Sequence, residues 1–107
     1  MNLTGKQKQF FKKEAHSLKP IFQIGKGGLS DEMIHQIQMA VEKRELIKIA
    51  LLQNTDEEAT EVAVELEQQT GAIVVQVIGH TVVLYKKARK EKDRELSTRF
   101  EKTFLNK

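Results

Sequence analysis

The sequence predicts a single α/β domain, a mixed four-stranded sheet packed with helices. Its length of 107 residues suits one compact domain, since ~100–150 residues is the commonest domain size. Apolar residues make up 39% of the chain and charged residues 31%, which is the ordinary balance of a globular protein. Segments with helical and strand-like patterns follow one another in the order α-β-α-β-α-β-β, which favours a sheet with crossover helices.

The first helix is expected to begin at Thr4, whose side chain can cap it, and to run to about residue 17. Phe10 and Phe11 fall on its apolar side, and lysines fall on the remaining side. Pro20 prevents continuation, because its ring removes a backbone donor and disfavours helical geometry in the preceding residue. Residues 21–24 then form a short strand.

The next two helices flank a strand over residues 46–52. Ser30 is a natural N-cap, and apolar residues recur after it at the three-four spacing of an amphipathic helix. Residues 54–56 supply a loop and a cap for the third helix, which should stop at Gly71, a favoured residue just beyond a helix end.

Two clear strands, residues 72–78 and 81–85, are separated only by Gly79 and His80, which predicts a two-residue hairpin. The first three strands are joined through helices, so they should run parallel by right-handed crossovers, with the last strand antiparallel. Residues 88–107 contain neither Gly nor Pro and carry Leu96, Phe100 and Phe104 at every fourth position. This segment is expected either to form a further helix or to remain disordered.

Charge is segregated along the chain. Up to Gly28 there are six lysines and one glutamate, and residues 86–107 hold nine basic residues and four acidic ones. Residues 29–85 hold three basic residues against ten acidic ones. Two basic ends around an acidic middle favour a polar molecule that presents a cationic face to a polyanion.

The residues give no support for catalysis. His16, His35 and His80 lack the spacing of a metal-binding helix, and the chain contains no Cys to act as a nucleophile or zinc ligand. We therefore expect no enzyme activity, no catalytic residue, no metal and no cofactor. The N-terminus lacks a signal-peptide apolar region, and no apolar run approaches the ~20 residues of a membrane span. A cytoplasmic protein without a membrane or small-molecule partner is expected.

The turn Gly25-Lys26-Gly27-Gly28 joins a predicted strand to a predicted helix. It matches neither the Walker A loop nor the G-x-G-x-x-G dinucleotide fingerprint. It is a G-x-x-G turn with a lysine inside, the kind of loop with which KH domains clamp a nucleic-acid backbone. Asp31 and Glu32 follow directly, so the loop amides and Lys26 would do most of the phosphate binding.

Five blocks of sequence, in order, resemble the YhbY family, the stand-alone bacterial form of the chloroplast RNA splicing and ribosome maturation (CRM) domain. They are LTGKQ at residues 3–7, AHSLKP at 15–20, IGKGGL at 24–29, ELIK at 45–48 and the segment 70–86. The resemblance implies a fold similar to the C-terminal domain of bacterial translation initiation factor three. It also implies RNA binding and association with large-subunit ribosomal precursors. The family's G-x-x-G loop corresponds to residues 25–28, and Lys86 stands where the family often has arginine, which alone binds phosphate bidentately.

These observations together predict an RNA-binding ribosome assembly factor, a monomer, with a CRM-type domain over residues 1–87 and a basic tail over 88–107. Scarce aromatic residues favour recognition of the RNA backbone over its bases. The alternative is a protein-interaction module that uses the acidic middle and the Leu96, Phe100 and Phe104 stripe. The predicted RNA-binding residues are Gly25, Lys26, Gly27, Gly28, Lys6, Lys8, Lys12, Lys13, Lys19, Lys86 and Lys87.

Overall fold

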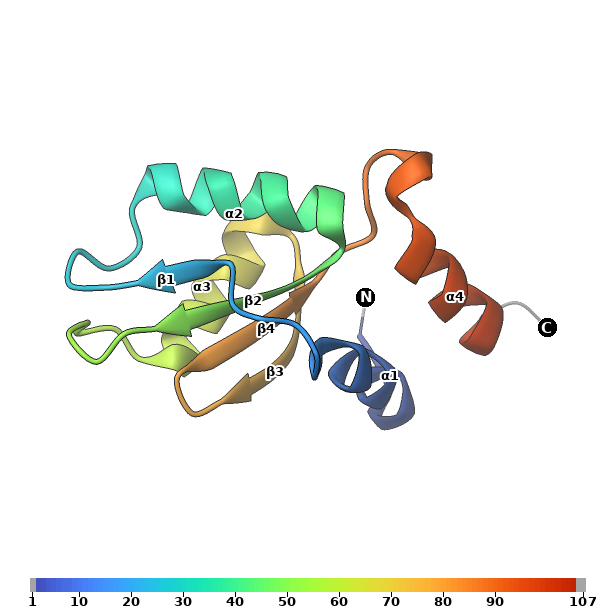
Figure 1. Ribbon diagram of the computed structural model, residues 1–107, viewed down its shortest axis with the longest axis horizontal. Helices are drawn as coiled ribbons and strands as arrows, with labels where there is room; N and C mark the ends of the chain where they lie inside the picture. Colours follow the sequence, from blue (N-terminus) through green and yellow to red (C-terminus); the bar gives the residue numbers. More distant parts are fainter. Residues whose placement is uncertain (1, 106–107) are drawn as a thin grey trace.

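The computed structural model describes residues 2–105, in which four strands form one sheet with helices on both faces (Figure 1). The molecule is elongated, with principal extents of 46 × 26 × 23 Å. Its elements in chain order are α1 (Gly5–Ala15), β1 (Phe22–Ile24), α2 (Asp31–Arg44), β2 (Leu46–Leu51), α3 (Ala59–Thr70), β3 (Ile73–Ile78), β4 (Thr81–Tyr85), the 3₁₀ turn η1 (Glu91–Asp93) and α4 (Glu95–Phe104).

The sheet has the strand order β1-β2-β4-β3. Strands β1 and β2 pair in parallel, whereas β4 is antiparallel to both of its neighbours, β2 and β3. The first three strands therefore run in one direction and the last runs against them, as the sequence predicts. A register shift between Val74 and Gln76 leaves Val75 as an extra residue in β3 and bends that edge strand.

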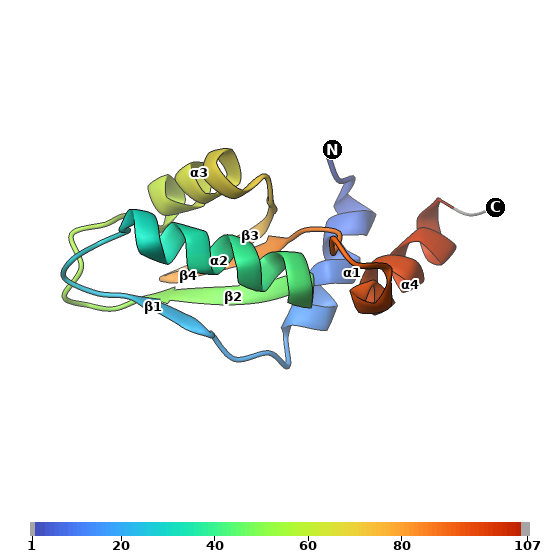
Figure 2. The ribbon, with the colours of Figure 1, turned by 90° about the horizontal axis from the view of Figure 1, so that it is seen from above.

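One face of the sheet is covered by α2 and α3 (Figure 2). Their apolar stripes bury Ile37 and Leu66 completely against strand residues such as Ile49 and Leu84, which are also fully buried. This is the larger of the two cores, and it fixes the β1–α2 and β2–α3 connections together at one end of the sheet (Figure 1).

The opposite face packs against α1 and α4, so the tail is a docked helix. The Phe11 ring stacks on Tyr85 with centroids 4.0 Å apart and contacts Phe100 at 4.7 Å. All three residues are at most 4% exposed. Of the two alternatives that the sequence leaves open for residues 88–107, the structure shows the helical one over Glu95–Phe104.

Most of the predicted helix and turn signals occupy their expected places. The Thr4 side chain caps α1 in a reciprocal capping box with Gln7, and Ser30 Oγ accepts from the Met33 amide at 3.1 Å. Gly71 ends α3 with φ of +75°. The predicted cap of α3 is wrong: the helix begins after Glu58 without any side-chain cap, because Thr55 turns its hydroxyl to the Glu57 amide instead.

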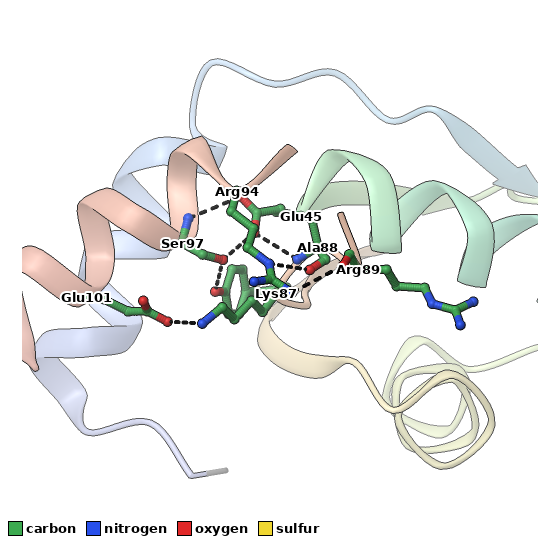
Figure 3. A network of polar contacts seen from close by, with 8 residues as sticks. Glu45, Lys87, Ala88, Arg89, Arg94, Ser97 and Glu101 are labelled. Atoms are coloured by element: carbon green, nitrogen blue, oxygen red, sulfur yellow. Dashed lines mark hydrogen bonds and ion pairs between the residues drawn. The ribbon is translucent and has the colours of Figure 1, made fainter. Parts of the chain in front are cut away.

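A buried carboxylate fastens the tail to the rest of the domain (Figure 3). Glu45 is only 1% exposed, and its oxygens accept from the amide of Ala88 at 2.9 Å and the amide of Ser97 at 3.1 Å. The Ser97 hydroxyl donates to the same carboxylate and also contacts the Tyr85 hydroxyl. Glu45 has a φ of +70°, which costs a non-glycine residue ~1–2 kcal/mol. The strain is offset by placing the carboxylate where these donors converge.

Candidate nucleic-acid interface

The G-x-x-G loop is an exposed turn between β1 and α2, at one end of the sheet (Figure 1). The Gly28 amide donates to the Gly25 carbonyl at 3.0 Å and closes the turn. Gly28 has φ of +67°, the left-handed conformation that glycine adopts without strain. The turn thus leaves Lys26 and Gly27 projecting into solvent, where an extended phosphate backbone can reach them.

The surroundings of this loop are more acidic than its own residues suggest. A Cβ at Gly28 would lie 2.6 Å from Oε1 of Glu57, which comes from the β2–α3 connection. The first turn of α2 adds Asp31 and Glu32. These carboxylates lower the positive electrostatic potential around the loop.

A second feature is a groove between α1 and the edge strand β3, with a volume of about 480 Å³. One side is a stripe of α1 with the spacing i, i+3, i+4, i+7, formed by Gln9, Lys12, Lys13 and His16. The other side is Gln76 and Ile78 of β3. We call this the α1 groove. It combines two ammonium groups, an imidazole and two amide side chains around one exposed apolar residue.

The α1 groove opens onto a part of the sheet that no helix buries completely. Leu46 of β2 packs in the core beneath α1, whereas Ile47 and Ile49 pack in the opposite core. Since strand side chains alternate, Lys48 lies on the α1 side of the sheet, where it is half-buried. Gln76 pairs in register with Val83, which also belongs to the core beneath α1. This face therefore offers polar and cationic side chains from α1, β2 and β3.

The remaining N-terminal lysines do not line the α1 groove. Lys6 is exposed and Lys8 half-buried on α1, outside the set of groove residues. Lys19 follows α1 and lines a separate hollow with Leu18, Ile21 and Arg44.

The predicted contribution of Lys86 and Lys87 to a free cationic surface is not supported. Lys86 Nζ lies 2.6 Å from Glu42 Oε2 and donates to the Thr70 carbonyl at 2.7 Å. The hydrogen bond from Lys86 lowers the pKa of Glu42 below its ordinary value of 4.5. Lys87 pairs with Glu101 of α4 at 2.7 Å (Figure 3). Both ammonium groups thus already have a carboxylate partner within the chain.

The structure therefore does not bring the predicted residues together on one surface. The loop lies at the far end of the sheet from α1 and α4, so Lys26 and the α1 lysines do not form one patch (Figures 1 and 2). Gln9, Gln76 and Lys48 were not among the predicted residues. The spacing of Gln9 relative to Lys12, Lys13 and His16 was visible in the sequence. The positions of Gln76 and Lys48 depend on sheet register and the bulge, which the sequence does not reveal.

Within residues 2–105, no group of three or more His, Asp or Glu side chains is arranged to hold a metal ion. None of the helices in this part of the chain has the length and apolar character that crossing a membrane requires.

Comparison with known proteins identifies relatives of this chain. The family model of the CRS1/YhbY (CRM) domain matches residues 3–86. A Bacillus subtilis protein named probable RNA-binding protein YqeI is 52% identical over 94 residues, covering 88% of this chain and 98% of the relative. A Haemophilus influenzae protein named RNA-binding protein is 36% identical, covering 84% and 91%. A solution structure of a Staphylococcus aureus protein superposes with a TM-score of 0.71 at 46% identity, covering 88% and 98%.

The match spans all four strands of the sheet and the helices α1, α2 and α3, and it ends one residue after β4. The Staphylococcus aureus structure has the same fold, and its 46% sequence identity to this chain indicates common ancestry as well. The chain belongs to the CRS1/YhbY (CRM) domain family.

Proposed function

We propose that this protein binds RNA through the α1 groove, with the G-x-x-G loop as a second contact, and acts in assembly of the large ribosomal subunit. The observation that carries RNA binding is a cationic groove on a fold whose relatives are named RNA-binding proteins. The ribosomal role rests on the resemblance to the YhbY family. A monomer in the cytoplasm, where ribosome precursors are assembled, is the form that we propose.

The groove chemistry suits a sugar-phosphate backbone. Lys12 and Lys13 supply ammonium groups that neutralise phosphates, which provides most of the binding free energy in such complexes. The amides of Gln9 and Gln76 can donate to and accept from ribose hydroxyls and base edges. These groups lie on one helix and one strand, so their spacing is fixed before RNA arrives.

Base stacking contributes little to this mode of binding. All six aromatic rings of the chain pack against the two cores, Phe22 on the side of α2 and α3 and the others beneath α1 and α4. Since stacking on aromatic side chains is the usual means of reading unpaired bases, backbone shape is the feature that this surface recognises.

The alternative function, a protein-interaction module, loses one of its two surfaces in this structure. Phe100 of the Leu96, Phe100 and Phe104 stripe is 1% exposed, and the other two side chains pack against the same core. The stripe therefore packs within the same chain, with Phe100 fully covered and Leu96 and Phe104 only partly exposed.

Two double variants test the proposal by fluorescence anisotropy with a structured fragment of large-subunit ribosomal RNA across a salt series. The double variant Lys12→Gln, Lys13→Gln removes both ammonium groups of the α1 groove. We expect about tenfold weaker binding at 0.1 M salt, and we expect the slope of log affinity against log salt to fall by about 1 for each phosphate that is no longer neutralised.

The double variant Lys26→Gln, Gly27→Asp tests the loop. Gly27 is chosen because nothing lies within 4 Å of an added Cβ, whereas Gly28 requires its positive φ.

Lys102→Gln on the exposed surface of α4 is the control, and its affinity should stay within twofold of the parent. Parent-like binding by the α1 double variant would exclude the groove as the RNA site. The ribosomal role has its own test in sucrose gradients at low and high salt. Co-sedimentation with large-subunit precursors supports the role, and recovery only in free fractions contradicts it.

A further inference from the structure

A second cationic groove lies at the end of the molecule away from the loop, where the tail crosses the C-terminal end of α2. It consists of two adjoining hollows with volumes of about 500 and 260 Å³ that share Lys43 and Asp93. We call it the tail groove. Six basic side chains line it, two from α2 and four from the tail: Lys43, Arg44, Arg89, Lys90, Lys92 and Arg99.

The carboxylates of the tail groove only partly offset this charge. Glu42 is already bound by Lys86, and the buried carboxylate of Glu45 accepts from the amides of Ala88 and Ser97. Asp93 and Glu95 are the two other acidic residues along the lining of the two hollows. The tail groove is therefore a region of positive electrostatic potential. Lys43 and Arg44 offset the dipole at the C-terminal end of α2 and also contribute to this potential.

Several of these cations are free to meet a ligand. Lys43, Arg44, Lys90 and Lys92 are exposed, and within residues 2–105 none of them lies in an ion pair. The side chain of Arg89 is 78% exposed, has a long contact of 3.7 Å to Glu42, and points away from the network around Glu45 (Figure 3). Arg99 differs, because both of its terminal nitrogens are held by Glu14.

The tail groove is built, in the sense that fixed contacts hold its two sides together. Glu45 comes directly after Lys43 and Arg44, and its carboxylate holds the amides of Ala88 and Ser97 on either side of η1. Arg94 donates to the carbonyls of Ala88 and Arg89 and so holds the bend between them. These contacts place the tail cations opposite the α2 cations whether or not a ligand is present.

We propose that the tail groove is a second RNA-backbone site, which takes phosphates of the same RNA that binds in the α1 groove. This inference rests on the proposed function and extends it to tail residues beyond the matched family segment of 3–86, which act together with Lys43 and Arg44 inside that segment. Met39 and Leu96 also line the tail groove, and Met39 is 58% exposed. A phosphodiester chain nevertheless fits the site, because six of the lining side chains end in ammonium or guanidinium groups, which phosphate oxygens satisfy.

Lysine footprinting of the intact protein tests the inference directly. An N-hydroxysuccinimide acetate acetylates exposed lysines, and mass spectrometry measures the rate at each position with and without the ribosomal RNA fragment. We expect RNA to slow acetylation of Lys43 and Lys92 by about fivefold or more. Lys13 should be slowed as well, as a member of the α1 groove, and Lys102 should react at the same rate in both samples.

Each outcome separates the two proposals. If RNA protects Lys13 but Lys43 and Lys92 are acetylated at the same rate with and without RNA, the tail groove is not an RNA site, whereas the proposal for the α1 groove is supported. No protection at any of these lysines would overturn RNA binding itself. A binding measurement supplies the second readout. The double variant Lys43→Gln, Lys92→Gln should lower the slope of log affinity against log salt by about 1 for each phosphate that is no longer neutralised. The control Lys102→Gln should leave this slope unchanged. A slope equal to that of the parent would also overturn the tail groove.

Discussion

Tyr85 lies where the sheet, α1 and α4 meet, and it reports on all three. Its ring stacks on Phe11, and its hydroxyl contacts Ser97, which in turn donates to Glu45. Burial raises the pKa of the Tyr85 phenol above its ordinary value of 10.0, and the hydrogen bond to Ser97 opposes part of that rise. The Glu45 carboxylate adds to it, because a negative charge disfavours ionisation of the phenol.

The titration of Tyr85 can be observed without interference, because the chain has one Tyr and no Trp. We expect the phenolate absorbance of the native protein to rise with a midpoint above 10.0. Since the folded-state pKa is the higher one, this group stabilises the fold below pH 10, and that contribution is lost as pH rises toward the folded-state value. Alkaline denaturant titrations of the Tyr85→Phe variant should show a smaller pH dependence. A native midpoint at or below 10.0 would mean that the hydroxyl is exposed and α4 is not docked.

Gly27 and Gly28 are neighbours, yet a substitution has different consequences at the two positions. Only Gly28 has a positive φ, and only there does an added Cβ approach Glu57. A substitution at Gly28 therefore tests backbone strain and RNA binding together, whereas one at Gly27 tests RNA binding alone.

At the scale of elements, α4 is held in place by residues that are distant in the sequence. Its apolar side completes the core beneath α1, and Arg99 forms a bidentate pair with Glu14 of α1. That hydrogen-bonded pair lowers the pKa of Glu14. The tail is therefore a structural component of the domain as well as a carrier of charge.

Replacing Phe100→Ala should destabilise the protein by ~3–5 kcal/mol, because it leaves a cavity between Phe11 and the other rings of this core. The free energy of unfolding from denaturant titrations measures the effect. Leu105→Ala is the matched control on the same segment, since Leu105 is 51% exposed, and it should change the free energy by less than ~0.5 kcal/mol. Equal, small effects of the two substitutions would show that α4 does not pack on α1.

The elements that could be predicted from the sequence are those with local signals. The Thr4 and Ser30 caps, Gly71 and the hairpin at Gly79 all act within a few residues, and each occupies its expected place. The docking of α4 could not be predicted, because its anchor joins Glu45 to residues 43 and 52 positions further along the chain.

The candidate site divides in the same way. The exposed loop and the basic side of α1 follow from spacing within a few residues, and the structure has both. The engagement of Lys86 by Glu42, 44 residues away, depends on the folded arrangement, as does the separation of the loop from α1. Sequence patterns thus located the cationic residues but not their partners or their grouping.

The whole molecule is polarised across its sheet. Helix α3, on one face, carries Glu61, Glu65 and Glu67 and has no basic residue in its last turn, whereas α1 on the opposite face ends with Lys12 and Lys13. An approaching RNA is therefore attracted to the α1 side and repelled from the α3 side, which fixes its orientation before any contact forms.

This polarity predicts how the acidic face affects affinity at different salt concentrations. RNA bound at α1 is separated from Glu61 and Glu65 by the thickness of the sheet and two helix layers, on the order of 20 Å. The Debye length is ~30 Å at 0.01 M salt and ~8 Å at 0.15 M, so repulsion from these carboxylates acts only at the lower concentration. Glu61→Gln with Glu65→Gln, both exposed, should strengthen RNA binding about twofold or more at 0.01 M and leave it unchanged at 0.15 M. Anisotropy titrations at the two concentrations measure both values, and an equal gain at 0.15 M would show that RNA lies against α3.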